Sequence, residues 1–392
     1  MGDTGRQPRG DEPLHVLSLI KGLGPGGAEE LLVSCALLAD PAAFRHEVGY
    51  LLPWKDALVS RLSRRDIPVH CLEVHNERDL RWTARLRRLL ARGRFDVVHV
   101  HSPYVAGPAR LTVASLPRRA RPRLVSTEHN VWSKFTPATH WLNRVTYGLG
   151  DGWLAVSHEV RNSIAPRWRS RVEVVVHGVD VEQISARRAD RDAVRVELGL
   201  EPDEIAVVTV ANLRDQKGYP DLLRAARRVV DHDSRVRFFA IGQGPLESEL
   251  RALHAALGLG DRFTFLGYRP DAPRVAAGCD LFCLASRYEG YPVALMEALV
   301  LGLPVVATAV GGVPDAIEDG VHGRLVPPSR FDLLAAAIER LVGDRPARER
   351  MGMAAAARGE DFDLRPAARR IEALYHSLVD ARERTPNRRA GG

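Results

Sequence analysis

The chain of 392 residues is long enough for two domains, and its 45% hydrophobic and 27% charged residues are typical of a soluble globular protein. No apolar run approaches the roughly 18–20 residues that span a bilayer, and the polar start MGDTGRQPRGDEP lacks the apolar core of a signal peptide. These features favour a cytoplasmic protein over a membrane-spanning or exported one.

The net charge of +7 is unevenly distributed. Residues 1–180 carry 26 Lys and Arg against 18 Asp and Glu, whereas residues 181–392 carry 30 against 31. The basic excess of the first half indicates an anionic partner or surface. The cysteines are Cys35, Cys71, Cys279 and Cys283. Their spacing fits no zinc site, and we expect Cys279 and Cys283, which lie in an apolar run, to be reduced core residues.

Strands and helices alternate along the first half of the chain. The predicted strands are 14–20, 46–52, 95–101, 123–129 and 152–157. Such alternation predicts a parallel sheet covered by helices on both faces. Open sheets of this kind bind ligands at the carboxyl ends of their strands. His101 and His129 each end a predicted strand, which places both at that edge.

The segment GPGGAE (24–29) follows the first predicted strand and opens a helix. Gly26 and Gly27 would let the backbone approach a ligand closely, and the helix start behind them favours negative charge. The pattern therefore predicts contact with a phosphorylated ligand. Two alternatives stay open, a tight turn without a ligand and a dinucleotide site. The second lacks its G-x-G-x-x-G signature.

The helical pattern 79–93 and the residue before it place arginines on a single face. They recur at spacings of three and four residues, and they are Arg78, Arg81, Arg85, Arg88 and Arg92. The segment PRRARPR (117–123) adds four more arginines. Each cation near an anionic leaflet contributes roughly 1 kcal/mol, so these residues predict reversible contact with an anionic membrane or a lipid-linked acceptor. The alternative is the solvated face of an ordinary helix, and no nucleic-acid recognition motif accompanies the arginines.

A second series of strands follows in the second half. The predicted strands are 205–212, 236–242, 263–268, 279–286, 304–308 and 323–327. Helical patterns separate them, which predicts a second domain of the same architecture. The stretch 181–204 is rich in charge and poor in apolar runs, so we expect a connector there.

The segment ANLRDQKGYPDLLRA places Arg214 and Lys217 in a loop between a predicted strand and a helix. Two cations three residues apart on such a loop can clamp a diphosphate and neutralise its charge while a bond to it breaks. The alternative is a pair of solvated surface cations. The two acids of the segment 287–312, further along the chain, favour the clamp.

The segment RYEGYPVALMEALVLGLPVVATAVGG (287–312) places two carboxylates eight residues apart. Pro292 suits the first turn of a helix, so Glu289 lies in the loop ahead of that helix and Glu297 lies inside it. The N–H groups at the helix start form an anion site beside the first carboxylate. The arrangement predicts a phosphorylated sugar, with Glu289 at sugar hydroxyls and Glu297 at a ribose. The alternative is a surface helix that carries two acids.

This segment resembles the E-x7-E motif of the retaining glycosyltransferases of family 4, and Arg214 and Lys217 match that family's phosphate-binding Arg and Lys. The resemblance covers roughly residues 14–380 and implies the α/β GT-B fold, in which two facing, doubly wound, Rossmann-like parallel-sheet domains have a ligand cleft between them. We then expect a disordered tail at 1–13, an N-terminal acceptor-side domain at 14–180, a linker at 181–204, a C-terminal nucleotide-sugar domain at 205–360, a helix at 361–383 that packs back on the first domain, and a disordered tail at 384–392.

The resemblance also implies roles for individual residues. His129 and Glu289 would act in catalysis, with His129 near the reactive carbon of the donor sugar. Tyr268 and Arg269 would lie beside the nucleotide base. The full set of implied donor-binding residues is Gly26, Gly27, Arg214, Lys217, Tyr268, Arg269, Gly290, Tyr291, Pro292, Val293 and Glu297.

Two departures from the family pattern bear on the site. The hinge segment VHGVD (176–180) lacks the Pro and Asn that the family commonly has there, which puts any donor contact from His177 in doubt. The acidic pair is not accompanied by a D-x-D motif. We therefore expect no metal and no cofactor.

The implied reaction is transfer of a sugar, with retained configuration, from a nucleoside-diphosphate sugar to a hydroxyl acceptor such as a glycolipid, a polysaccharide precursor or a small glycoside. An epimerase or a phosphorylase of the same fold is one alternative. A glycogen-type phosphorylase needs a pyridoxal-phosphate lysine, and the only lysines are Lys21, Lys55, Lys134 and Lys217. A non-catalytic nucleotide-sugar-binding protein is the other alternative. The intact set of two acids and two cations argues against it.

Overall fold

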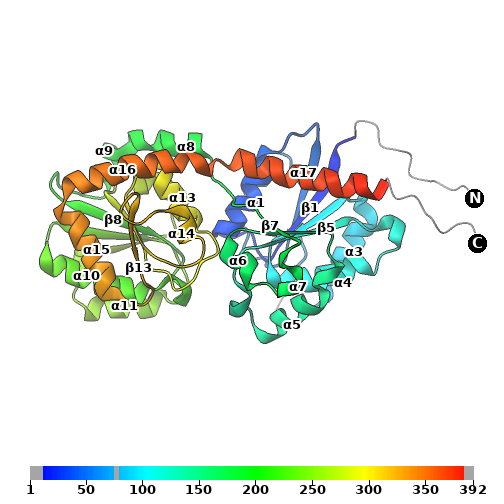
Figure 1. Cartoon of the computed structure of the whole chain (residues 1–392), viewed down its shortest axis with the longest axis horizontal. Coiled ribbons are helices and arrows are strands. Elements are labelled where there is room, and N and C mark those ends of the chain that lie inside the picture. Colours follow the sequence, from blue (N-terminus) through cyan, green and yellow to red (C-terminus); the bar gives the residue numbers. More distant parts are fainter. Residues whose placement is uncertain (1–11, 75–78, 384–392) are drawn as a thin grey trace, which may run out of the picture. The chain divides into compact units, whose positions relative to one another are not determined.

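A computed structural model of the protein describes residues 12–74 and 79–383, and the chain divides into two compact units (Figure 1). Unit 1 runs to Val176 and resumes at Arg365. Unit 2 is His177–Leu364. Each unit has its own parallel sheet and its own covering helices.

Some sequence predictions fall outside the described residues. They are the tail at 384–392, all but the last two residues of the tail at 1–13, and Arg78. Within the described ranges, no helix is both long enough and apolar enough to cross a bilayer.

Unit 1 is built on a seven-stranded sheet with the order β3-β2-β1-β4-β5-β6-β7. The strands are β1 (Leu14–Ile20), β2 (Phe44–Tyr50), β3 (Val69–Cys71), β4 (Val97–Val100), β5 (Arg123–Glu128), β6 (Gly152–Ala155) and β7 (Val172–Val174). Every pairing is parallel. The strand order reverses between β1 and β4, and a doubly wound sheet offers a ligand crevice at such a reversal.

Helices cover both faces of this sheet. They are α1 (Gly27–Leu38), α2 (Val59–Ser63), α3 (Arg81–Gly93), α4 (Pro103–Ala114), α5 (Pro137–Thr146), α6 (His158–Ser163), α7 (Pro166–Arg169) and the C-terminal α17 (Leu364–Glu383), with short 3-10 turns η1 (Arg118–Ala120), η2 (Trp132–Lys134) and η3 (Tyr147–Leu149). On one face, α3 and α4 bury Trp82, Leu86 and Val105 against the sheet. On the other face, α17 packs Ile371 and Tyr375 against strand residues of unit 1.

Unit 2 has a six-stranded parallel sheet with the order β10-β9-β8-β11-β12-β13. Its strands are β8 (Ile205–Val210), β9 (Val236–Ile241), β10 (Phe263–Gly267), β11 (Leu281–Leu284), β12 (Val305–Thr308) and β13 (Gly323–Val326). The helices are α8 (Val181–Ser185), α9 (Arg191–Glu197), α10 (Tyr219–His232), α11 (Glu247–Ala256), α12 (Ala272–Ala277), α13 (Val293–Val300), α14 (Val313–Ala316), α15 (Phe331–Gly343) and α16 (Arg345–Gly359), and the 3-10 turns are η4 (Ala186–Asp190), η5 (Asp215–Lys217), η6 (Gly260–Arg262) and η7 (Glu360–Phe362). Here the order reverses between β8 and β11.

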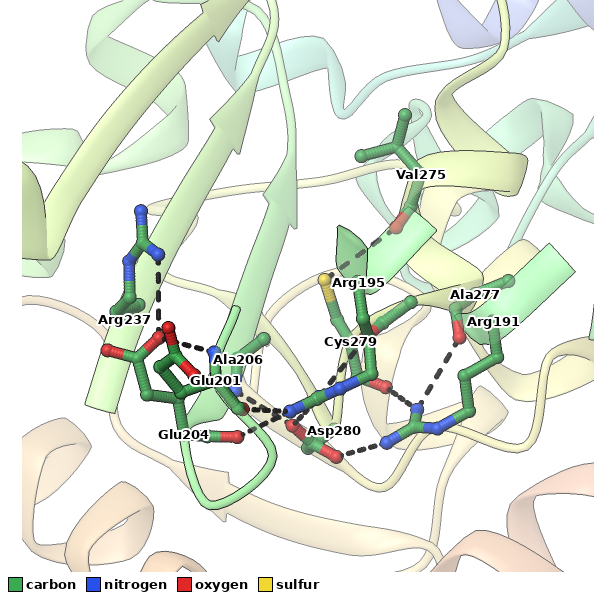
Figure 2. A network of polar contacts seen from close by, with 11 residues as sticks. Arg191, Arg195, Glu201, Glu204, Ala206, Arg237, Val275, Ala277, Cys279 and Asp280 are labelled. Atoms are coloured by element: carbon green, nitrogen blue, oxygen red, sulfur yellow. Dashed lines mark hydrogen bonds and ion pairs between the residues drawn. The ribbon is translucent and has the colours of Figure 1, made fainter. Parts of the chain in front are cut away.

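The stretch 181–204, which the sequence predicts to be a linker, is instead a folded part of unit 2. Figure 2 shows that Asp280, just before β11, accepts hydrogen bonds from Arg191 at 2.5 Å and from Arg195 at 3.1 Å. The same carboxylate also accepts the backbone N–H of Ala206 at 2.8 Å. The charges that suggested a connector therefore tie α9 by ion pairs to Asp280, whose carboxylate also bonds to the backbone of β8.

The two places where the chain passes between the units lie side by side within unit 2. The N–H of Val179 donates to the carbonyl of Phe362 at 2.8 Å, and the N–H of Leu364 donates to the carbonyl of Val179 at 3.0 Å. A Cβ on Gly178 would come within 2.4 Å of the backbone of Asp363. Glycine at this position therefore permits the close approach of the two segments.

Unit 1 should lose stability in mildly acidic solution because of His46 on β2. Burial, together with nearby His15, lowers the pKa of this imidazole from 6.5 to about 4. The unfolded chain therefore takes up the proton at a higher pH than the folded chain. The stabilisation from a neutral His46 is complete above pH 6.5 and is lost as the pH falls toward 4. We expect the free energy of unfolding in urea to fall by about 2 kcal/mol between pH 7 and pH 5.

The variant His46→Gln provides the control for this prediction. Gln cannot take up a proton in this range, so its free energy of unfolding should change much less between the two pH values. Equal pH dependence in the two proteins would show that His46 is not the responsible group. Protonation of Glu47 lowers the stability of unit 1 only at a lower pH. Desolvation would raise the pKa of this carboxylate, but hydrogen bonds from His15 and His70 hold it at about 2.

Candidate active site

The predicted acid Glu289 and the predicted cation Lys217 meet at the strand-order reversal of unit 2. Lys217 closes the loop after β8, and Glu289 lies in the loop after β11. The Nζ of Lys217 lies 2.5 Å from Oε1 of Glu289, and the hydroxyl of Ser286 donates to the same oxygen at 2.6 Å. Glu289 is only 4% exposed. Two donors thus fix one carboxylate oxygen and hold the side chain in a single orientation.

Backbone contacts fasten these two loops together. The side-chain amide of Gln216 donates to the carbonyl of Tyr288 at 3.0 Å, and the N–H of Arg287 donates to the carbonyl of Gln216 at 2.8 Å. Gly218 has a φ of +63°, and a Cβ there would lie 2.0 Å from the carbonyl oxygen of Ala285. Only glycine allows this approach, so the Q-K-G sequence sets the position of the lysine.

Arg214, the other predicted cation, lies in a different environment from Lys217. It is exposed at the start of η5, and among the described residues its guanidinium makes no ion pair. Burial raises the pKa of the Tyr288 phenol, and the nearby positive charge of Arg214 partly offsets that rise. Lys217 therefore organises the buried acid, whereas Arg214 presents its charge to solvent.

The rest of the E-x7-E segment forms the start and body of α13. Pro292 is the N-cap residue and Val293 the first helical residue, so the helix begins one position later than Pro292 alone suggests. The N–H of Gly312 donates to the carbonyl of Gly290 at 2.8 Å, and Tyr291 packs on Phe362 with ring centroids 5.9 Å apart. Glu297 lies half-buried inside the helix. The predicted contact of Glu297 with a ribose remains a prediction.

The two residues predicted beside the nucleotide base follow β10. Tyr268 is 38% exposed. The guanidinium of Arg269 bonds to Asp271 at 2.7 Å and to Glu197 at 2.8 Å, and these hydrogen bonds raise its pKa further above the ordinary value. Base contact by both residues remains a prediction, and the side chain of Arg269 is already engaged by two acids of its own unit.

In unit 1, the glycine-rich segment lies at the carboxyl end of β1, beside the reversal of strand order. Gly26 is the N-cap residue of α1 and Gly27 its first residue, so the cap residue itself offers no side-chain oxygen to the N–H groups of this helix end. The Nζ of Lys21 lies 4.7 Å from the centre of the Tyr104 ring, at the start of α4. The loop thus adjoins a lysine and an aromatic ring that the sequence analysis did not single out.

His129 belongs to a row of side chains that crosses the sheet of unit 1. Its Nε2 lies 3.4 Å from Nδ1 of His101, whose ring centre is 4.0 Å from that of His99. His99 is buried, with Nδ1 2.6 Å from the hydroxyl of Tyr375 and Nε2 2.7 Å from the hydroxyl of Thr127. The predicted catalytic histidine is therefore linked to α17, the C-terminal helix, through two further imidazoles.

Sequence reasoning missed several of these supporting residues. Ser286 and Thr308 were not singled out, although Thr308 donates to the carbonyl of Ser286 at 2.5 Å and so steadies the residue that holds Glu289. The H-x-H pattern of His99 and His101 was a usable signal, because alternate strand residues share a face. No local signal could have found Tyr375.

The predicted arginine face of α3 is less cationic than its sequence suggests. Arg81 forms a two-bond ion pair with the buried Asp79, at 2.9 Å for each bond. Arg85 lies 3.4 Å from Glu73 and also donates to the backbone. Arg88 and Arg92 remain exposed on the helix. The membrane prediction thus rests on two of the four described arginines.

Solved structures resemble this fold along nearly the whole chain. Anabaena HepE in complex with UDP and glucose aligns with a TM-score of 0.81 at 23% identity, covering 93% of this chain and 100% of that one. Sucrose-phosphate synthase from Thermosynechococcus elongatus aligns with a TM-score of 0.75 at 18% identity, covering 94% and 100%. At these identities the likeness shows the GT-B fold alone.

Curated relatives resemble part of the chain in sequence. A D-inositol 3-phosphate glycosyltransferase of Mycobacterium sp. (strain KMS) is 36% identical over 227 residues, which are 56% of this chain and 50% of the relative. The alpha-D-kanosaminyltransferase of Streptomyces kanamyceticus is 29% identical over 249 residues, 62% of this chain and 64% of that protein. The chain thus spans about half the length of the first of these relatives.

Two family models match consecutive parts of the chain. The model described as Glycosyltransferase Family 4 matches residues 14–183, and the model described as Glycosyl transferases group 1 matches residues 190–358. Between them they take in both sheets and the Lys217–Glu289 pair. The chain therefore belongs to glycosyltransferase family 4.

Proposed function

We propose that this protein is a retaining glycosyltransferase that moves a sugar from a nucleoside-diphosphate sugar to a hydroxyl acceptor. The observation that carries the proposal is the buried Lys217–Glu289 pair, joined at 2.5 Å at the strand-order reversal of unit 2, with Arg214 exposed on the same loop. Family membership and the transferase names of the sequence relatives support it.

Each residue would have a distinct task. Arg214 and Lys217 would neutralise the diphosphate as it departs, because charge that develops in a transition state is best stabilised by donors already in place. Glu289 would hold sugar hydroxyls and so orient the ring. Glu297 would bind the ribose hydroxyls, and His129 would contact the sugar near the reacting carbon. Gly26, Gly27 and the turn before α13 would approach the donor through their backbone.

The bond changes follow from the retained configuration. The bond between the anomeric carbon and the phosphate oxygen breaks, and the acceptor oxygen bonds to the same face of that carbon. The departing phosphate takes the proton of the acceptor hydroxyl. This reaction does not require a side chain that attacks the sugar. Glu289, which is held by Lys217 and Ser286, would orient the sugar instead.

The test is incubation of the purified protein with a panel of UDP-, GDP- and ADP-sugars, followed by mass spectrometry. We expect slow release of the nucleoside diphosphate from one class of donor, and Lys217→Ala should slow that release by roughly 10²- to 10³-fold. Binding of a nucleotide sugar without any turnover, in the presence of hydroxyl acceptors, would instead favour a non-catalytic binding protein.

The same assay tests metal independence. Among the described residues, no group of three or more His, Cys, Asp or Glu side chains is placed to hold a metal ion. We propose that cationic side chains and a helix N-terminus stabilise the diphosphate, so turnover should survive EDTA. Strict dependence on added magnesium or manganese would mean that the phosphate site has been misidentified.

We also propose a cytoplasmic location with reversible contact to the inner membrane surface, and an acceptor that is lipid-linked or a precursor in cell-envelope or polysaccharide biosynthesis. The exposed Arg88 and Arg92 of α3 support contact with anionic lipid, while the ion pairs of Arg81 and Arg85 weaken it. Each free cation near such a surface contributes roughly 1 kcal/mol.

A further inference from the structure

Helix α5 of unit 1 has its polar and apolar sides reversed. Its buried side chains are Asn143 and Thr146. Its exposed side chains include Trp141 and Val145, which are 65% and 54% exposed, and Leu149 in the adjoining turn η3 is 46% exposed. A helix that served only the fold would bury such residues and expose the polar ones.

The buried polar side of α5 is fully used by the fold. The amide of Asn143 donates to the carbonyl of Pro103 at 2.8 Å, and its oxygen accepts from the buried Arg110 at 2.8 Å. The hydroxyl of Thr146 donates to the carbonyl of Leu142 at 2.7 Å. The two Asn143 bonds hold α5 against α4, and the Thr146 bond lies within α5. The apolar stripe takes no part in these contacts.

The stripe is continuous along the helix. Trp141 and Val145 lie four residues apart and so share one side of α5, and Leu149 follows four residues later in η3. In Figure 1, α5 lies at the outer edge of unit 1. We call these three residues the α5 stripe.

The α5 stripe lies in a strongly basic part of unit 1. From position 97 to 171 the sequence has eleven Lys and Arg against three acids. Of these acids, Glu128 is 2% exposed, and Asp151, which lies beside Leu149, pairs with Arg123 at 2.8 Å. The elements α4, η2 and α7, which contact α5 through hydrogen bonds or ring contacts, carry no carboxylate. Arg144 and Arg167 are exposed beside the stripe and form no ion pair among the described residues.

We propose that the α5 stripe inserts into the interface of an anionic lipid bilayer, with Arg144 and Arg167 contacting the headgroups. A tryptophan between aliphatic side chains and arginines suits this boundary, where one end of the ring is apolar and the other is hydrated. The positive surroundings match anionic headgroups and would repel an acid-poor copy of the same surface. Insertion of the α5 stripe into a bilayer does not require glycosyl transfer, and it uses a different surface from the arginines of α3.

The experiment is co-sedimentation of the full chain with vesicles of phosphatidylglycerol and phosphatidylcholine in equal parts, and with phosphatidylcholine alone. We expect binding to the anionic vesicles that weakens with salt. The triple variant W141S/V145S/L149S should bind about tenfold or more weakly, because three apolar side chains no longer leave water. Since all three are exposed, far-UV circular dichroism and urea unfolding of the variant should match the parent.

The matched control is W54S, which removes an equally exposed tryptophan, 64% against 65%, from a loop outside α5. It should bind as the parent does. Brominated lipids should quench part of the tryptophan fluorescence of the parent, and W141F should lose that part while still binding. An unquenched Trp141, or equal loss of binding in W54S, would overturn the insertion.

A further variant separates the two membrane proposals. R88S/R92S removes the free cations of α3, so it should lower binding at low salt but leave the quenching of Trp141 intact. Loss of binding in R88S/R92S with full binding of the triple variant would keep the α3 contact and overturn the α5 stripe. A concentration-dependent dimer that only the triple variant abolishes would assign the stripe to self-association and would also overturn the proposal.

Discussion

Replacing Lys217 with Ala should lower kcat by roughly 10²- to 10³-fold, because a donor placed in advance of the charge that it stabilises is among the largest single contributions to a rate. The same change should lower the free energy of unfolding by about 3 kcal/mol. Glu289 is 5% exposed in its side chain and Lys217 is 18% exposed, so removal of the lysine leaves a buried carboxylate without its cation. Turnover of the donor found in the panel and unfolding in urea measure the two effects.

Arg214→Ala is the matched control, because it removes a cation from the same loop without breaking an ion pair. We expect a similar loss of kcat with a change in unfolding free energy within about 0.5 kcal/mol. The double change Lys217→Met with Glu289→Gln should recover stability but not turnover, since it leaves no buried charge. Near-normal turnover in Arg214→Ala and Lys217→Ala together would show that neither cation meets a diphosphate.

The strands of unit 2 and the central strands of unit 1 were predictable from sequence, whereas the two edge strands of unit 1 were not. Runs such as 14–20 and 205–210 are continuous apolar segments because helices cover both faces of those strands. The strands β3 and β7 have three residues each, and each lies at an edge of its sheet with a single partner. Half-covered side chains leave no apolar run to detect.

The segment 181–204 was misjudged for a different reason. Its charges look like those of a solvated connector, but Arg191 and Arg195 converge on Asp280, which lies more than eighty residues further along the chain. Charge in a sequence shows that partners are needed, but it does not say whether water or a distant carboxylate provides them. The reversed sides of α5 were hidden likewise, because the partner of Asn143 is the buried Arg110 of another helix.

The site was predictable where the motif is local. Glu289 and Glu297 are eight residues apart, and the turn and helix between them follow from Gly290 and Pro292. The pairing of Lys217 with Glu289 joins residues 72 positions apart, and it depends on β8 and β11 being neighbours in the sheet. The sequence therefore predicts the candidate residues, while the strand order decides that Lys217 and Glu289 touch.

His129→Ala should lower kcat by about 100-fold or more if the imidazole acts on the reacting sugar. The neighbouring row predicts a second, smaller effect. Tyr375→Phe removes only the hydroxyl that lies 2.6 Å from Nδ1 of His99, so His99 loses one of the two partners that fix its ring. We expect kcat to fall severalfold with the KM for the donor unchanged, because the change reaches the site only through His101 and His129.

This split in the kinetic constants distinguishes positioning from loss of structure. Phe keeps an aromatic ring at position 375 in the core that α17 forms with the sheet. The control is Ser377→Ala, an exposed position on the same helix, which should leave kcat and KM unchanged. If Tyr375→Phe raised KM as much as it lowered kcat, or left both unchanged, α17 would serve only to cover the sheet. If it lowered kcat alone, the C-terminal helix would be part of what holds the histidine in its working orientation.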